Sequence, residues 1–255
     1  MASLTKMLAI LDLFTPDTPA WNVEGIAAKL QYSVPTTYRY VKELCSAGLL
    51  LSKPGAKFML GARIIELDYQ IRTADPLLKA AQPIMNALAH EVNCDVVLGM
   101  LYNNDVLTIH HEFVGEGVQP GYGRGRKLPP FKGALSKAVL SSISRKELDK
   151  FYDANQQSDD GSVIIQWDEL LEDVKKTRAR QYAISKGELE KAFVGIAVPM
   201  KNANLDIAAA LGLIMTPRYF SLIETRRVVE ILRDCATRIL RDLDEGTSRL
   251  SSLPA

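Results

Sequence analysis

The chain has 255 residues, 47% of them hydrophobic, and a formal net charge of +1 at pH 7. This length and apolar content predict about two domains with a large core, and only a local cluster of cations could argue for a nucleic-acid partner. Three widely spaced cysteines without a CxxC pair argue against a disulfide framework or a zinc knuckle, and no apolar run is long enough to span a membrane, so we expect a cytoplasmic protein without a membrane partner.

The N-terminal segment is predicted to form three short helices around one core. Apolar residues recur at helical spacing over residues 4–14, where Ser3 would begin the first helix. The same pattern returns over residues 22–31, and Asn22 is a suitable N-cap. Only a short turn separates this second helix from the helical stretch 33–50, which matches the spacing of a helix-turn-helix unit.

The stretch 33–50 carries the strongest functional signal in the chain. Ser33 is expected to cap this helix, and Pro35 lies in its first turn, where a missing N–H costs nothing. A stripe at helical spacing should pack against the body: Thr37, Val41, Leu44, Cys45 and Gly48. The outer arc offers hydroxyls and cations, which suit phosphates and base edges, and the residues expected to contact DNA are Ser33, Thr36, Tyr38, Arg39 and Lys42.

A basic hairpin is predicted directly after this helix. Two apolar runs flank residues 53–57, a composition typical of a β-hairpin, and this hairpin would be the wing of a winged helix with DNA contacts from Lys53 and Lys57. Between residues 29 and 63 six cations stand against Glu43 alone, a local excess of five positive charges. Each signal alone fits an ordinary solvated surface, but their order and spacing together favour DNA binding.

The rest of the chain is predicted to form a linker helix and a second domain. Apolar residues in 61–74 exceed what a lone connector needs, so this helix could help dimerisation. A second helix follows Pro76, and β-rich runs from residues 95 and 106 meet at a hairpin turn. Three helices, two apolar strands and a long closing helix complete an α/β sensor domain on an antiparallel sheet; their expected positions are 133–143, 145–155, 168–180, 193–200, 207–215 and 222–243.

The order of these parts and several local strings resemble the isocitrate-lyase-regulator (IclR) family of bacterial transcription factors over nearly the whole chain. The strings are SLTKMLAILDLF, the 33–50 helix, the 57–65 stretch ending LGARII, KLPPFKGALSKAVL and RARQYAISKGELEKAFVGIAVPM. The resemblance implies an α+β protein with a winged helix-turn-helix domain over residues 1–61, a linker helix over 62–75 and a GAF-like effector-binding domain over 76–250. It also implies no cofactor, and dimers that can pair into tetramers on a palindromic operator.

The resemblance also implies the positions of the binding residues. The family's DNA contacts fall on Ser33, Val34, Pro35, Thr36, Tyr38 and Arg39, with wing contacts near Lys53 and Lys57. Val34 and Pro35 stand where polar residues are common, which shifts the expected contacts toward Arg39 and Lys42. The implied effector site consists of Val118, Pro120, Phe131, Ala134, Leu135, Ser136, Ser185, Phe193, Gly195, Leu213 and Met215.

Several of these effector-site residues depart from the family pattern. Phe131 stands where a His is usual, Ser185 where an acid is common and Gly195 where a Cys is frequent, so the pocket is expected to be less polar than the family norm. Free backbone N–H groups at the start of the GALSKA helix could still bind an anion. We therefore expect an organic acid or related carbonyl compound whose apolar body rests on Phe131, Phe193, Leu213 and Met215.

Other chemistry receives little support from the sequence. His110 and His111 are adjacent in a predicted strand, so their side chains should point to opposite faces, and no HxH or HxxxH spacing is present; no metal is expected. The GYGRGR run lacks the spacing of a phosphate-binding loop. An enzyme that uses Ser136 with Lys137 or Glu188 is an alternative, although no complete set of nucleophile, base and orienting group is visible.

The sequence thus predicts a ligand-responsive DNA-binding transcriptional regulator, with repression relieved by the effector as the favoured mode. An activator of the same family is the first alternative. An α/β enzyme, or a scaffold that uses its winged helix for protein contacts, are the others. A salt series separates DNA binding from protein contacts, because cation-driven DNA binding weakens steeply as the salt concentration rises.

Overall fold

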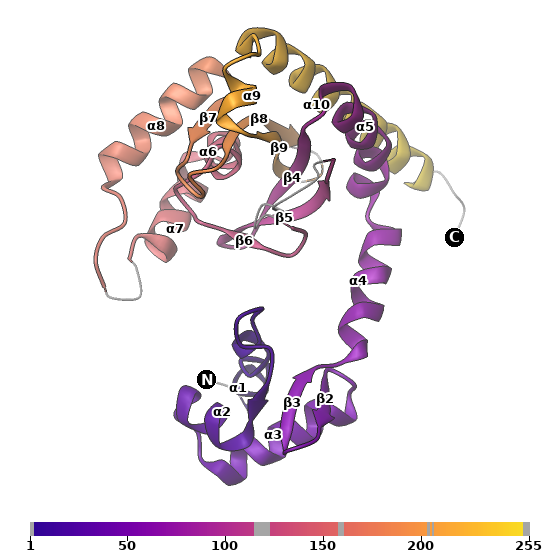
Figure 1. The fold of residues 1–255 in the computed structure, drawn as a ribbon, viewed down its shortest axis with the longest axis vertical. Coiled ribbons are helices and arrows are strands. Elements are labelled where there is room, and N and C mark those ends of the chain that lie inside the picture. Colours follow the sequence, from indigo (N-terminus) through magenta and orange to yellow (C-terminus); the bar gives the residue numbers. More distant parts are fainter. Residues whose placement is uncertain (1–2, 115–122, 158–160, 203–204, 206, 252–255) are drawn as a thin grey trace. The chain divides into compact units, whose positions relative to one another are not determined.

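The computed structural model describes residues 3–114, 123–157, 161–202, 205 and 207–251. Two compact units divide the chain, Met1–Asp75 and Pro76–Ala255 (Figure 1). Among the described residues, no helix combines the length and apolar character that crossing a membrane requires.

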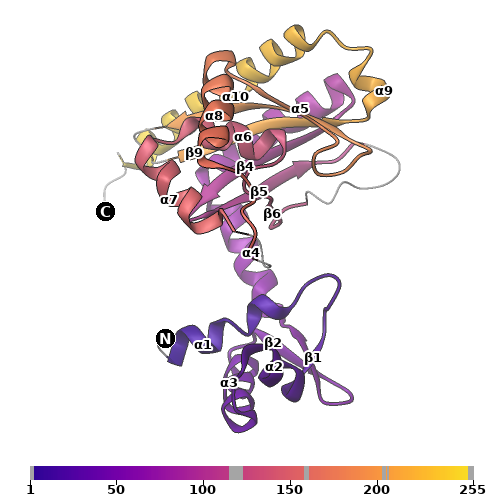
Figure 2. The ribbon, with the colours of Figure 1, turned by 90° about the vertical axis from the view of Figure 1, so that its left-hand side faces the viewer.

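The N-terminal unit combines short helices with a small antiparallel sheet, as predicted (Figure 2). Its helical elements are α1 (Ser3–Leu8), the 3₁₀ helix η1 (Leu11–Leu13), α2 (Val23–Leu30), α3 (Val34–Ser46) and α4 (Ala62–Ala74). Its strands are β1 (Trp21–Asn22), β2 (Leu50–Lys53) and β3 (Lys57–Leu60), in the order β1-β3-β2. The winged helix-turn-helix predicted from the sequence is therefore confirmed, with β1 as an additional edge strand.

The two predicted helix caps are present. The side chain of Asn22 accepts a hydrogen bond from the backbone N–H of Gly25, and that of Ser33 accepts one from the N–H of Thr36. Each cap satisfies a backbone donor that the first helical turn leaves without a partner. These caps fix where α2 and α3 begin, and so set the turn between them.

The first predicted helix is shorter than expected. The helix ends at Leu8, and a 3₁₀ turn follows in which the N–H of Leu13 bonds to the carbonyl of Ile10. This tighter turn carries Ile10 into the core, where it is fully buried, whereas Leu4 is mostly exposed. Tyr40 is also buried in this core, and its hydroxyl lies 3.1 Å from the hydroxyl of Ser3. Helical spacing alone did not identify either buried residue, because the kink rotates the face that α1 would have presented.

The second unit is built on one six-stranded antiparallel sheet with the order β6-β5-β4-β9-β8-β7. Its strands are β4 (Asp95–Tyr102), β5 (Asp105–Glu112), β6 (Lys127–Leu128), β7 (Ala183–Lys186), β8 (Val194–Asn202) and β9 (Ile207–Met215). Its helices are α5 (Pro76–Val92), α6 (Ala134–Ser142), α7 (Arg145–Asn155), α8 (Trp167–Arg180), α9 (Pro217–Phe220) and α10 (Thr225–Ser251). The predicted antiparallel sheet with surrounding helices is confirmed, while β6, β7 and α9 are elements that the sequence pattern did not reveal.

The sheet separates two hydrophobic cores. One core lies between the sheet and the pair α5 and α10, and the other between the sheet and α6, α7 and α8 (Figure 1). Because successive strand residues point to opposite faces, alternate residues of β9 enter different cores. Leu211 and Leu213 pack toward α5 and α10, whereas Ala210 and Ile214 pack toward α6. This alternation decides which predicted pocket residues can reach a ligand.

Candidate nucleic-acid interface and ligand pocket

The outer face of α3 presents the polar groups predicted to contact DNA. Arg39 and Lys42 are exposed, and Tyr38 is 62% exposed. Thr36 is half-buried, and its hydroxyl accepts a hydrogen bond from the hydroxyl of Ser33 at 2.8 Å. Ser33 therefore serves first as a cap, while the three exposed side chains form the outward surface of the helix.

The guanidinium of Arg39 lies over the ring of its neighbour. Its Cζ is 5.5 Å from the centroid of the Tyr40 ring, within the range of a cation–π contact. Since Tyr40 is buried, this contact anchors the base of a side chain whose cation remains in solvent. The arrangement orients a planar donor outward, which is the geometry needed to reach a guanine edge or a phosphate.

The wing places two lysines directly opposite each other. Lys53 and Lys57 are cross-strand partners in the β2 and β3 pairing, and both are exposed. Like charges in this position destabilise a hairpin slightly. Among the ion pairs of the described residues, none involves Lys53, Lys57, Arg39 or Lys42. These four cations thus have no carboxylate partner within the unit and suit a polyanion.

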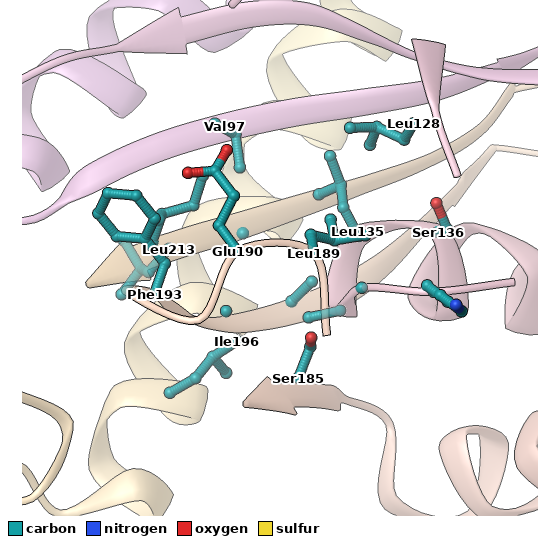
Figure 3. Close-up of a pocket in the computed structure, with 17 residues that line it drawn as sticks. Val97, Leu128, Leu135, Ser136, Ser185, Leu189, Glu190, Phe193, Ile196 and Leu213 are labelled. Atoms are coloured by element: carbon teal, nitrogen blue, oxygen red, sulfur yellow. The ribbon is translucent and has the colours of Figure 1, made fainter. Parts of the chain in front are cut away.

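A pocket lies in the second unit between the start of α6, the sheet and the loop that joins β7 to β8 (Figure 3). Seven of the eleven predicted effector-site residues line it: Ala134, Leu135, Ser136, Ser185, Phe193, Gly195 and Leu213. The cavity has a volume of about 40 Å³. That volume holds a few waters and is far below the roughly 300–1,000 Å³ of typical ligand sites, so the pocket has to widen to admit a ring.

Four predicted residues do not line this pocket. Val118 and Pro120 lie outside the described residues. Phe131 is buried in the core on the α7 side, with its ring centroid 5.7 Å from that of Phe151. Met215 lies on the opposite face of the sheet, in the core with α5 and α10. The expectation that Phe131 and Met215 support the body of a ligand was therefore wrong.

Leu213 lies on the same side of β9 as Met215. Its side chain belongs to the core with α5 and α10, although the residue also lines the pocket. It therefore offers the ligand only a boundary position, since alternation along the strand directs its side chain to the other core.

Most of the remaining lining residues are apolar and were missed from the sequence. They are Val97, Leu128, Lys132, Gly133, Leu189, Glu190, Ile196, Ala197, Gly212 and Ile214. Val97 and Ile214 could have been found from strand alternation, but only with knowledge of which face α6 covers. Leu189 and Glu190 come from a loop with no periodic pattern, so no sequence signal marked them.

The start of α6 does not have the free donor that we expected from the sequence. Oε2 of Glu188 accepts a hydrogen bond from the N–H of Gly133 at 3.0 Å, and Oε1 accepts one from Nζ of Lys137 at 2.8 Å. A carboxylate of the protein itself therefore occupies the place where the helix dipole would favour an anion. The physical reason for the difference is the β7–β8 loop, which brings Glu188 back onto the helix from more than fifty positions further along the chain.

The groups considered for catalysis are engaged in structural contacts. The hydroxyl of Ser136 donates to the carbonyl of Pro129 at 2.9 Å, and Lys137 pairs with Glu188. Burial raises the pKa of Cys94 to about 11 and also raises the pKa of Cys235, so both thiols stay protonated at neutral pH. Within the described ranges, no three His, Cys, Asp or Glu side chains converge in a way that could hold a metal ion.

Comparison with known families gives two matches. Residues 3–54 match the IclR helix-turn-helix domain, and residues 71–241 match the C-terminal domain of the bacterial transcriptional regulator IclR. The chain belongs to the IclR family. Its members are DNA-binding transcriptional regulators rather than enzymes, which agrees with the prediction from the sequence and with the exposed cationic face of α3.

Individual relatives of this IclR-family chain are distant in sequence but similar over their full length. The HTH-type transcriptional regulator KipR of Bacillus subtilis is 23% identical over 94% of this chain and 96% of its own. The p-hydroxybenzoate hydroxylase transcriptional activator of Acinetobacter baylyi is 26% identical over 94% and 90%. The crystal structure of an IclR homolog complexed with 4-hydroxybenzoate from Microbacterium hydrocarbonoxydans has a TM-score of 0.77 at 22% identity, over 96% and 100% of the two chains. This last likeness shows the shared fold.

Proposed function

We propose that the protein represses a catabolic operon and leaves its operator when a small organic acid or related carbonyl compound binds the pocket. The observation that carries this proposal is the pairing of an unpartnered cationic surface on α3 and the wing with a nearly closed apolar pocket in the second unit. An activator is the second candidate, because a relative of similar length is a transcriptional activator.

We propose a homodimer, able to pair into a tetramer, as the form that binds DNA in the cytoplasm. Support comes from α4, which has no buried residues and exposes several apolar side chains, including Ile65 at 71% and Tyr69 at 62%. Such a surface is costly for a helix that stays in water and suits a partner helix. Two copies of α3 would then meet half-sites about one helical turn apart, or a multiple of that spacing.

The proposed link between ligand and DNA is a shift between two arrangements of the dimer. A ligand changes such an equilibrium only through its different affinity for the two states. The small volume of the pocket supplies a source of that difference, since a ligand must displace the side chains of Leu135 and Leu189 before it fits. A thermal-shift screen of carboxylic acids, lactones and amides identifies ligands, because binding to the native state raises its apparent stability.

Replacement of Arg39 by Ala tests the DNA-binding surface. We expect Arg39→Ala to weaken binding to a duplex selected from genomic fragments by about 1–3 kcal/mol and to leave ligand affinity unchanged. Fluorescence anisotropy over a salt series measures the affinity, and the slope against log salt should become shallower by about one contact. Arg226→Ala is the matched control, because it removes the same charge from an exposed position in the second unit. Equal loss of DNA and ligand binding in Arg39→Ala would instead identify Arg39 as structural.

A further inference from the structure

The loop between β7 and β8 is a closed structural unit beside the pocket. The N–H of Gly187 bonds to the carbonyl of Phe193 at 3.0 Å, and the N–H of Phe193 bonds to the carbonyl of Glu190 at 3.0 Å. Gly187 has φ of +66°, a left-handed conformation that glycine adopts without strain. The loop therefore holds residues 188–190 in defined positions over the start of α6.

Two successive loop side chains fix the loop to Gly133. The carboxylate of Glu188 bonds to its N–H, and Cδ1 of Leu189 lies 2.7 Å from where a Cβ on Gly133 would stand. Gly133 itself has φ of +87° and begins α6. An anion at this position gains from the helix dipole and from Lys137, whose Nζ lies 2.8 Å from Oε1 of Glu188.

A second, independent group in the pocket is available to a ligand. Ser185 is only 5% exposed, yet its hydroxyl has no hydrogen-bond partner in the part of the chain that the structure describes. Figure 3 shows its oxygen pointing into the space beside α6. A buried hydroxyl in this position costs free energy unless a water or a ligand bonds to it. The group it would bind is a single neutral donor or acceptor.

We infer that Glu188 determines which polar group the pocket accepts, and that the effector is a neutral carbonyl or hydroxyl compound with an apolar body. The inference rests on the proposed effector pocket. With Glu188 in place, a ligand carboxylate at the start of α6 would lie beside a like charge in a site of low polarity. A neutral amide, ester or hydroxyl avoids this repulsion and can bond to Ser185, while its body packs on Leu135 and Phe193.

Removal of Glu188 is expected to turn the helix start into an anion site. In Glu188→Ala, formate should bind in the space vacated by the carboxylate and shift the amide resonance of Gly133 in a saturable way. We expect a dissociation constant at least tenfold lower than in the unaltered chain. Calorimetry with benzamide and benzoate gives a second readout, in which the variant should change the affinity ratio toward benzoate by tenfold or more. Glu188→Gln, which keeps the size of the side chain but not its charge, should change the same ratio in the same direction.

The controls separate this inference from folding and from the proposed function. Glu172→Ala removes an acid that pairs with Lys176 on α8 and should change neither readout. Circular dichroism and the melting temperature show whether each variant folds. Formate binding that is equal in Glu188→Ala and the unaltered chain, or absent from both, overturns the role of Glu188. Loss of duplex binding by the unaltered chain would overturn the proposed function instead, because formate binding at Gly133 does not depend on DNA.

Discussion

Replacement of Gly61 by Ala should unfold much of the DNA-binding unit. Gly61 is buried between the wing and α4, and a Cβ on it would stand 2.1 Å from the carbonyl oxygen of Gly48. Its φ of −89° is ordinary, so the cost is purely steric. Because the neighbour is backbone and cannot rotate away, we expect a loss of at least about 3 kcal/mol, the upper end of overpacking effects.

The clash would also break two hydrogen bonds that join the end of α3 to the start of α4. The N–H of Gly61 bonds to the carbonyl of Leu49 at 2.8 Å, and the N–H of Arg63 bonds to that of Gly48 at 3.2 Å. Hydrogen exchange of the α3 amides should therefore accelerate more than a hundredfold, which is the loss of about 3 kcal/mol expressed as an equilibrium constant. Binding to the duplex should fall with it.

Gly246→Ala provides the comparison for this variant. Gly246 lies in α10, and no atom lies within 4 Å of the position of its missing Cβ. Alanine is a better helix former than glycine, so this change should be neutral or stabilise the second unit by up to about 1 kcal/mol. If α3 exchanged at the same rate in Gly61→Ala as in Gly246→Ala, the close packing at Gly61 would be disproved.

The features of the fold that could be predicted from the sequence are those that depend on local chemistry. Asn22 and Ser33 cap their helices because capping needs only a side-chain oxygen and the next three residues. The wing followed from two apolar runs around a turn, and the β8 and β9 pair from two long apolar runs. Each of these signals is contained in a few neighbouring residues, so a single sequence is sufficient to reveal it.

The features that could not be predicted depend on contacts between distant segments. Met215 and Phe131 are apolar and close in the chain to pocket residues, but the covering helices direct one to the opposite core and the other toward α7. The contact between Glu188 and Gly133 joins residues 55 positions apart, and neither residue type announces it. Resemblance to a family placed most of the pocket, whereas this chain's own departures from the family decide its polarity.

The last prediction concerns Leu135, whose side chain lies across glycines of the sheet. A Cβ on Gly99 would stand 2.5 Å from Cδ2 of Leu135, and a Cβ on Gly212 would stand 3.2 Å from its Cδ1. The absence of side chains on these strand residues lets α6 approach the sheet closely. Gly99→Ala should therefore cost about 1–3 kcal/mol of unfolding free energy, because Leu135 has to leave its position.

A double-mutant cycle identifies Leu135 as the source of that cost. Leu135→Ala alone should destabilise the unit by about 2 kcal/mol, the low end for a buried leucine, since the side chain borders a cavity. In that background Gly99→Ala should cost almost nothing, which gives a coupling energy of about 1–3 kcal/mol in urea denaturation. Simple additivity of the two changes would show that Gly99 is needed for the bulge in β4 rather than for Leu135. Because Leu135→Ala also widens the pocket, bulkier neutral ligands should bind this variant more tightly, and that gain should persist when Gly99 is replaced as well.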